Sequence, residues 1–91
     1  MKDDKNKDEN LNDKKVEIFS TPTCHFCILA KNWFIEKGIS YVDYNVASDI
    51  TKRKEMVELT GQLGVPVIKI GEEVIIGFNP HKIAKILALS I

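Results

Sequence analysis

Two cysteines three residues apart constrain this chain more than any other feature of its sequence. They lie in the segment 21–27, which reads Thr-Pro-Thr-Cys-His-Phe-Cys, and they are the only two cysteines among 91 residues. If a helix begins at or just before Cys24, both side chains lie on one helical face about 5–6 Å apart, within the Cα separation of a disulfide. The pair can therefore form and break a disulfide with little backbone movement.

The position of each cysteine on such a helix predicts a different role for each thiol. Cys24 would lie at the helix N-terminus, where unpaired N–H groups and the positive end of the helix dipole favour a thiolate. The thiolate is the form that attacks disulfides. We therefore expect Cys24 to be the nucleophile and Cys27, one turn further along, to be the resolving thiol. A protonated His25 could stabilise the Cys24 thiolate and make the disulfide more oxidising; the alternative is an exposed histidine that only tolerates the helix start.

Length and charge limit the classes of function. Ninety-one residues suffice for one small domain, and Lys plus Arg equals Asp plus Glu at 13 each. This balance gives no reason to expect a nucleic-acid or membrane partner, and no apolar run approaches the ~18 residues of a membrane span. We expect a monomer in the cytoplasm. In that reducing compartment, a lone Cys-x-x-Cys pair is more often catalytic or metal-binding than structural.

The N-terminal segment differs from the rest of the chain. Met1 to Lys15 carry ten charged residues, five of each sign, with Leu11 as the only apolar residue after Met1. Such a segment cannot bury enough apolar surface to offset the entropy of ordering. We predict a disordered charged tail over residues 1–14 and a folded domain over residues 15–91. A docking arm is the alternative for the tail.

Hydrophobic periodicity and chain breakers predict seven elements in the order β-α-β-α-β-β-α. The strands are expected at 16–19, 41–46, 65–70 and 74–76, and the helices at 24–37, from Ser48 or Asp49 to about 60, and from Pro80 to 91. In the first helix, Phe26, Leu29, Ala30, Trp33 and Phe34 recur at helical spacing; in the last, Ile83, Ile86, Leu87 and Ile91 do. Gly38 and Gly61 are suited to end the first two helices.

This order predicts an α/β fold with a four-stranded mixed sheet flanked by three helices. Each early strand-helix-strand unit is expected to form a right-handed crossover between parallel strands. The link at residues 71–73 is too short for anything except an antiparallel hairpin. Helices on both faces of the sheet would bury its apolar strands.

Three motifs in this order resemble those of a glutaredoxin, with its thioredoxin-like fold, over nearly all of residues 15–91. They are the Cys-His-Phe-Cys segment after a strand, Gly-Val-Pro-Val-Ile at 64–68, and Gly-Phe-Asn-Pro at 77–80. The resemblance implies that Pro66 is a cis-proline facing the dithiol and that the Val65 backbone binds the peptide part of a substrate. Val65, Pro66, Gly77, Phe78 and Asn79 are thereby the expected substrate-binding residues.

The same resemblance implies a thiol-disulfide oxidoreductase that needs no bound cofactor. Its substrate would be a disulfide in a protein or small molecule, and its electron donor glutathione or thioredoxin reductase. Thr21, Gly64 and Asn79 replace the Lys, Thr and acidic residue of many glutaredoxins, and loss of charge should weaken glutathione binding. Residues 77–80 are instead similar to the Gly-Phe-Arg-Pro of small redoxins that draw electrons from thioredoxin reductase and supply ribonucleotide reductase.

Other readings of these residues stay open. A glutathione-dependent iron–sulfur cluster carrier is the main alternative function, since some glutaredoxins hold a cluster between two chains. A zinc site would need His25 and His81 beside the cysteines, without the second closely spaced pair that structural zinc usually has. The basic run 52–54 could bind a carboxylate, although a solvated helix face explains it as well.

Overall fold

The computed structural model describes residues 14–88 and contains the seven predicted elements in the predicted order. They are β1 (Val16–Ser20), α1 (His25–Glu36), β2 (Val42–Asn45), α2 (Ile50–Thr60), β3 (Val67–Ile70), β4 (Glu73–Ile76) and α3 (Pro80–Leu87). The predicted tail, apart from Lys14, and the predicted end of the last helix at Ile91 lie outside the described residues. Within residues 14–88, no helix combines the length and the hydropathy needed to cross a bilayer.

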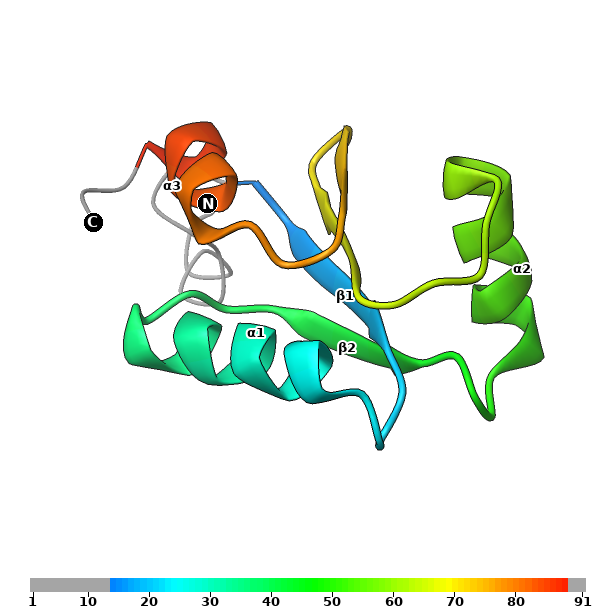
Figure 1. Ribbon diagram of the computed structural model, residues 1–91. Coiled ribbons are helices and arrows are strands. Elements are labelled where there is room, and N and C mark those ends of the chain that lie inside the picture. The colour runs from blue at the N-terminus through cyan, green and yellow to red at the C-terminus, as the bar shows by residue number, and fades with distance from the viewer. Residues whose placement is uncertain (1–13, 89–91) are drawn as a thin grey trace, which may run out of the picture.

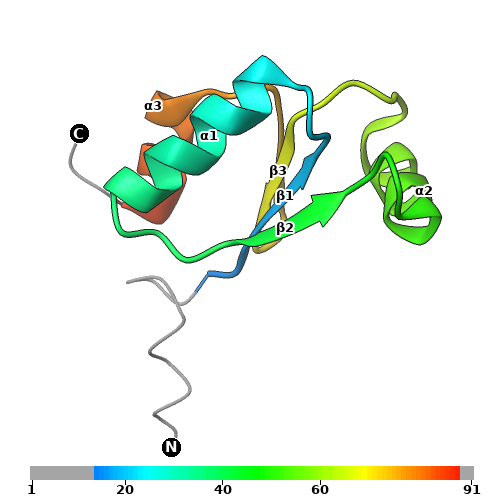
Figure 2. The ribbon, with the colours of Figure 1, turned by 90° about the horizontal axis from the view of Figure 1, so that it is seen from below.

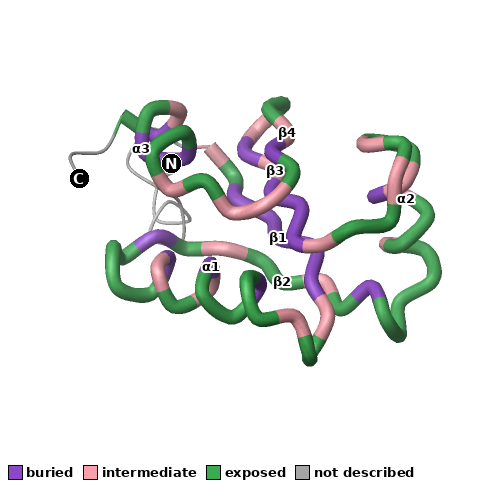
Figure 3. Tube along the Cα trace, in the orientation of Figure 1, coloured by how far each residue is buried: buried purple, intermediate pink, exposed green. Residues whose placement is uncertain are grey.

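The four strands form one mixed sheet in the order β2-β1-β3-β4, with β1 between its neighbours. β1 pairs parallel with β2 and antiparallel with β3, and the β3–β4 hairpin is antiparallel as predicted. All five residues of β1 are buried, which Figure 3 shows as a continuous purple segment. The strand that leads into the cysteine segment is therefore the best-buried strand of the sheet.

The direction of β3 corrects one prediction. Parallel pairing was expected for both early strand-helix-strand units, and it holds for β1 and β2 but not for β3. Ser20 pairs with Asn45 at the end of β2, and Phe19 pairs with Val67 at the start of β3. β2 therefore ends at the same end of β1 at which β3 begins. The segment 61–66 returns the chain from α2 to that end, so β3 must run back along the sheet (Figure 1).

The helices cover both faces of the sheet. Figures 1 and 2 show α1 and α3 on one side and α2 on the other. The core between the sheet and α1 and α3 consists of Val16, Ile18, Ala30, Phe34, Ile39, Ile68, Ile70, Ile75, Ile83 and Leu87. The smaller core under α2 consists of Phe19, Val46, Met56 and Val67. Each face thus has its own apolar cluster, as the predicted layers require.

α1 packs on the sheet through part of the predicted apolar stripe: Ala30 and Phe34 lie in the core, and Trp33 packs against it. Its buried residues are Cys27, Ala30 and Phe34, which follow one another at three and four residues. Phe26 and Leu29, expected in the apolar stripe, are 59% and 38% exposed. The helix has apolar residues on two faces, and only the packing against the sheet decides which face is buried.

The ends of α2 agree with the sequence signals. Asp49 is the N-cap, and its side chain accepts the Lys52 backbone N–H at 3.1 Å; Gly61 ends the helix in the left-handed conformation with φ of 73°. The Lys52 ammonium pairs with Glu55 at 3.0 Å and lies 4.2 Å from the centroid of the Tyr44 ring. Lys52, part of the basic run at 52–54, therefore already has two partners within the chain.

Candidate active site

Cys24 lies at the junction between β1 and α1 and is the N-cap residue of the helix. Its backbone is extended, with φ of −86° and ψ of 115°, and its sulfur accepts the Cys27 backbone N–H at 3.2 Å. The sulfur thereby accepts a hydrogen bond from one of the backbone N–H groups at the helix start, which have no carbonyl partner within the helix. The thiol is half-buried, so it remains open to a disulfide from outside. This is the position expected for a nucleophile.

Cys27 lies one helical turn further along α1 and is fully buried, with 0% of its surface exposed. Burial, and to a smaller extent the hydrogen bond with Cys24, raises the pKa of the Cys27 thiol to about 12. At neutral pH, Cys27 is therefore a protonated thiol that external reagents reach poorly. Both cysteines are free thiols. The two cysteines thus have opposite environments within a single helical turn.

The segment before β3 lies against the Cys24 sulfur. The Val65–Pro66 peptide bond is cis, as the resemblance implied, and the Cys24 thiol donates to the Val65 carbonyl at 3.8 Å. Pro66 is buried, and neither residue belongs to β3, which begins at Val67 rather than at the predicted Val65. Proline has no N–H to donate to the strand ladder, which explains the later start. Val65 and Pro66 are thereby brought to the dithiol.

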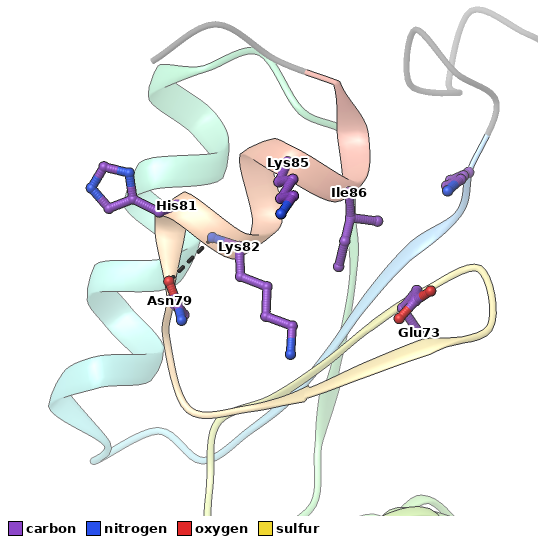
Figure 4. Close-up of a pocket in the computed structure, with 7 residues that line it drawn as sticks. Glu73, Asn79, His81, Lys82, Lys85 and Ile86 are labelled. Atoms are coloured by element: carbon purple, nitrogen blue, oxygen red, sulfur yellow. Dashed lines mark hydrogen bonds between the residues drawn. The ribbon is translucent and has the colours of Figure 1, made fainter.

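The segment 77–79 joins the site through Pro66. The Gly77 N–H donates to the Pro66 carbonyl at 2.8 Å, and Gly77 has φ of 91°, which a residue with a side chain rarely adopts. Phe78 is half-buried, and its ring centroid lies 6.0 Å from that of Trp33. Asn79 is the N-cap of α3, and its Oδ1 accepts the Lys82 backbone N–H at 3.1 Å (Figure 4). The Asn79 oxygen is therefore used in holding the helix.

Comparison with known proteins agrees with this geometry. The family model described as Glutaredoxin matches residues 16–75. The chain belongs to the glutaredoxin family. A glutaredoxin-like 8.6 kDa protein of the rubredoxin operon of Clostridium pasteurianum is 46% identical over 72 residues, which cover 79% of this chain and 96% of that protein. Glutaredoxin 3 of Escherichia coli K12 is 36% identical over 55 residues, or 60% of this chain and 66% of that protein.

The fold is also that of solved glutaredoxins. The crystal structure of a glutaredoxin from Archaeoglobus fulgidus superposes with a TM-score of 0.72 at 19% identity, covering 85% of this chain and 92% of that one. The thioredoxin-like fold predicted from the sequence is therefore confirmed. Membership of the glutaredoxin family makes the protein a redox enzyme of the thiol-disulfide oxidoreductase class.

The two histidines of this glutaredoxin are exposed. The ring of His25 lies edge-on to that of Phe26, with 5.5 Å between centroids, and its effect on Cys24 stays a prediction. Within residues 14–88, no group of three or more His, Cys, Asp and Glu side chains could hold a metal ion. A cluster held between two chains takes one cysteine from each, so the iron–sulfur alternative stays open.

A hollow of about 670 Å³ lies beside α3 (Figure 4). It is lined by Lys14, Glu73, Asn79, His81, Lys82, Lys85 and Ile86. Asn79 is the only expected site residue among them, and neither cysteine lines it. The dithiol of this glutaredoxin therefore lies outside this hollow, where the start of α1 meets the segment at Val65.

One charged side chain near the site belongs to none of the sequence motifs. Lys31 follows Cys27 by four residues on α1, and its ammonium pairs with Asp43 of β2 at 2.9 Å. A spacing of four on a helix is the only sequence signal that places it beside the buried thiol. Asp43 carries no such signal, because the pairing of β2 with β1 decides what it faces.

Proposed function

We propose that this glutaredoxin reduces disulfides through a two-cysteine cycle. The Cys24 thiolate attacks one sulfur of the substrate disulfide, and the other substrate sulfur leaves with the bonding electron pair and takes up a proton. Cys27 then attacks the Cys24 sulfur of the mixed disulfide. The second substrate thiol is released, and the Cys24–Cys27 disulfide remains. A donor of two electrons and two protons restores the dithiol.

The observation that carries this proposal is the contrast between the two thiols. Cys24 is half-buried at the N-terminus of α1, and Cys27 is fully buried one turn away. The Cys27 backbone N–H donates a hydrogen bond to the Cys24 sulfur. An attacking thiol needs access, whereas a resolving thiol needs only to reach its neighbour. The geometry suits a nucleophile and a resolving thiol in that order.

The surroundings of Cys24 support a protein disulfide as the substrate. Within residues 14–88, the Val65 N–H has no hydrogen-bond acceptor, so it can pair with an extended peptide as an added strand would. Three exposed apolar side chains lie within two residues of Cys24, Val65 and Gly77 along the chain: Phe26 at 59%, Leu63 at 64% and Ile76 at 59%.

We propose glutathione or thioredoxin reductase as the electron donor, in the reducing cytoplasm. The absence of the basic and acidic groups at Thr21 and Asn79 weighs against tight glutathione binding. Two parallel assays distinguish the donors: one supplies NADPH, glutathione and glutathione reductase, and the other supplies NADPH and thioredoxin reductase. The system that supports turnover of a disulfide substrate identifies the donor.

Trapping of the intermediate tests the roles of the two cysteines. Cys27→Ser should accumulate a mixed disulfide between Cys24 and a disulfide-containing protein, seen as a single adduct by mass spectrometry that a reductant removes. Cys24→Ser should form no adduct and reduce no disulfide, because Cys27 is buried. Reduction by Cys24→Ser at the wild-type rate would show that the roles are assigned wrongly.

A further inference from the structure

Lys31 brings a positive charge to the same side of α1 as the buried thiol. Residues four apart on a helix are neighbours, with about 5–6 Å between their Cβ atoms. The Lys31 ammonium does not extend freely into solvent, because it donates to Asp43 Oδ2 at 2.9 Å and the Lys31 side chain is only 24% exposed. The cation is thus held between α1 and β2.

Asp43 is itself held by the strand that leads to the cysteines. Its Oδ1 accepts the hydroxyl of Ser20 at 2.6 Å, and Ser20 is 2% exposed. Asp43 is the partner of Ile18 in the β1–β2 register, and Ile18 belongs to the core under α1. Asp43 therefore faces α1. Side chains from β1, β2 and α1 together fix the position of the ammonium.

The resolving step requires a charge at Cys27 that its surroundings disfavour. Burial raises the pKa of this thiol, yet the thiol must lose its proton to attack Cys24. Two groups act in the opposite direction and favour the thiolate, the backbone at Thr21 and the charge of Lys31, and only Lys31 is a cation. The hydrogen bond to Asp43 raises the pKa of Lys31, so the lysine stays charged while Cys27 ionises.

We propose that Lys31, held by Asp43 and Ser20, is a positioning residue that stabilises the Cys27 thiolate during resolution of the mixed disulfide. This inference depends on the two-cysteine cycle proposed above. In this step the Cys27–Cys24 sulfur bond forms and the Cys24–substrate sulfur bond breaks. The proton lost by Cys27 is matched by the proton that the departing substrate thiolate takes up. Lys31 exchanges no proton and forms no bond.

The two steps can be timed separately with a peptide disulfide-linked to a coloured aromatic thiol. Attack by Cys24 releases the aromatic thiol, and resolution by Cys27 then releases the peptide thiol, measured after acid quenching by mass spectrometry. Lys31→Gln should leave the release of colour unchanged and slow the release of peptide by roughly tenfold. Lys31→Arg should restore the release of peptide to within about twofold of wild type, because it restores the charge.

Lys37→Gln is the matched control, since it removes the same charge from an exposed residue at the end of the same helix and should change neither step. Wild-type release of peptide by Lys31→Gln would overturn the proposal. So would equal slowing by Lys31→Gln and Lys31→Arg, or slowing of the colour step as well. Cys27→Ser distinguishes a failure of the Lys31 inference from a failure of the two-cysteine cycle. If Cys27→Ser releases the peptide as wild type does, the two-cysteine cycle itself is wrong.

Discussion

At the scale of single residues, one helical turn separates two thiols with opposite environments. Cys24 caps α1 and is half-buried, whereas Cys27 is 0% exposed. The spacing of the pair and the expected helix start predicted the position of Cys24. The burial of Cys27 could not be predicted from spacing, because it results from the packing of α1 on the sheet. That packing leaves one thiol half-buried and the other fully buried, which is the contrast that the proposed two-cysteine cycle uses.

The burial of Cys27 predicts a dependence of stability on alkaline pH. Its folded-state pKa is raised from 9.0 to about 12, so the folded protein keeps the proton where the unfolded chain loses it. This contribution to stability is fully present below pH 9 and is lost as the pH rises toward 12. Between these values the free energy of unfolding should fall by about 1.4 kcal/mol per pH unit.

Urea unfolding of the reduced protein from pH 8 to pH 11 measures this effect. Lysines and tyrosines also titrate in this range, so the informative quantity is the difference between wild type and Cys27→Ala. Wild type should lose stability more steeply above pH 9 than the variant does. Parallel curves for the two proteins would show that the thiol does not ionise differently on unfolding.

At the scale of helices and strands, predictions succeeded where a residue imposes a local constraint. Gly61 and Pro80 mark a helix end and a helix start within one residue. The predictions failed where the outcome depends on distant packing: the exposure of Phe26 and Leu29, and the direction of β3. The segment 77–79 was found by its motif, but the bond from Gly77 to Pro66 that brings it to the site required the folded chain.

Asn79 is predicted to stabilise α3 through its cap. Asn79→Ala should lower the free energy of unfolding by about 1 kcal/mol, because the Lys82 N–H loses its acceptor. Asn79→Asp should keep the cap and place a favourable negative charge at the helix N-terminus. Chemical denaturation of the three proteins measures both effects. Equal losses for the alanine and aspartate variants would contradict the assigned cap.

At the scale of the whole molecule, the sheet depends on two separate cores of unequal size. The core under α2 contains only Phe19, Val46, Met56 and Val67. Met56 is the one buried residue of α2 and is 0% exposed. The attachment of α2 therefore depends on a single fully buried side chain. α2 in turn leads into the segment that presents Val65 to Cys24.

Met56→Ala should lower the free energy of unfolding by about 2–5 kcal/mol, because it leaves a cavity in the smaller core. Leu59→Ala, on the same helix but 39% exposed, is the control and should cost less than about 1 kcal/mol. Urea unfolding of both variants measures the difference. Similar losses in the two variants would mean that α2 is not anchored through Met56.

The central claim is that Cys24 and Cys27 of one chain are oxidised together to an internal disulfide when a substrate disulfide is reduced. Counting thiols during the reduction of a limiting protein disulfide, with the mass of the product, tests it most directly. We predict that each substrate disulfide reduced consumes both thiols of one chain and yields a monomer with an internal Cys24–Cys27 disulfide. Loss of a single thiol per chain, or a product linked between two chains, would contradict the account.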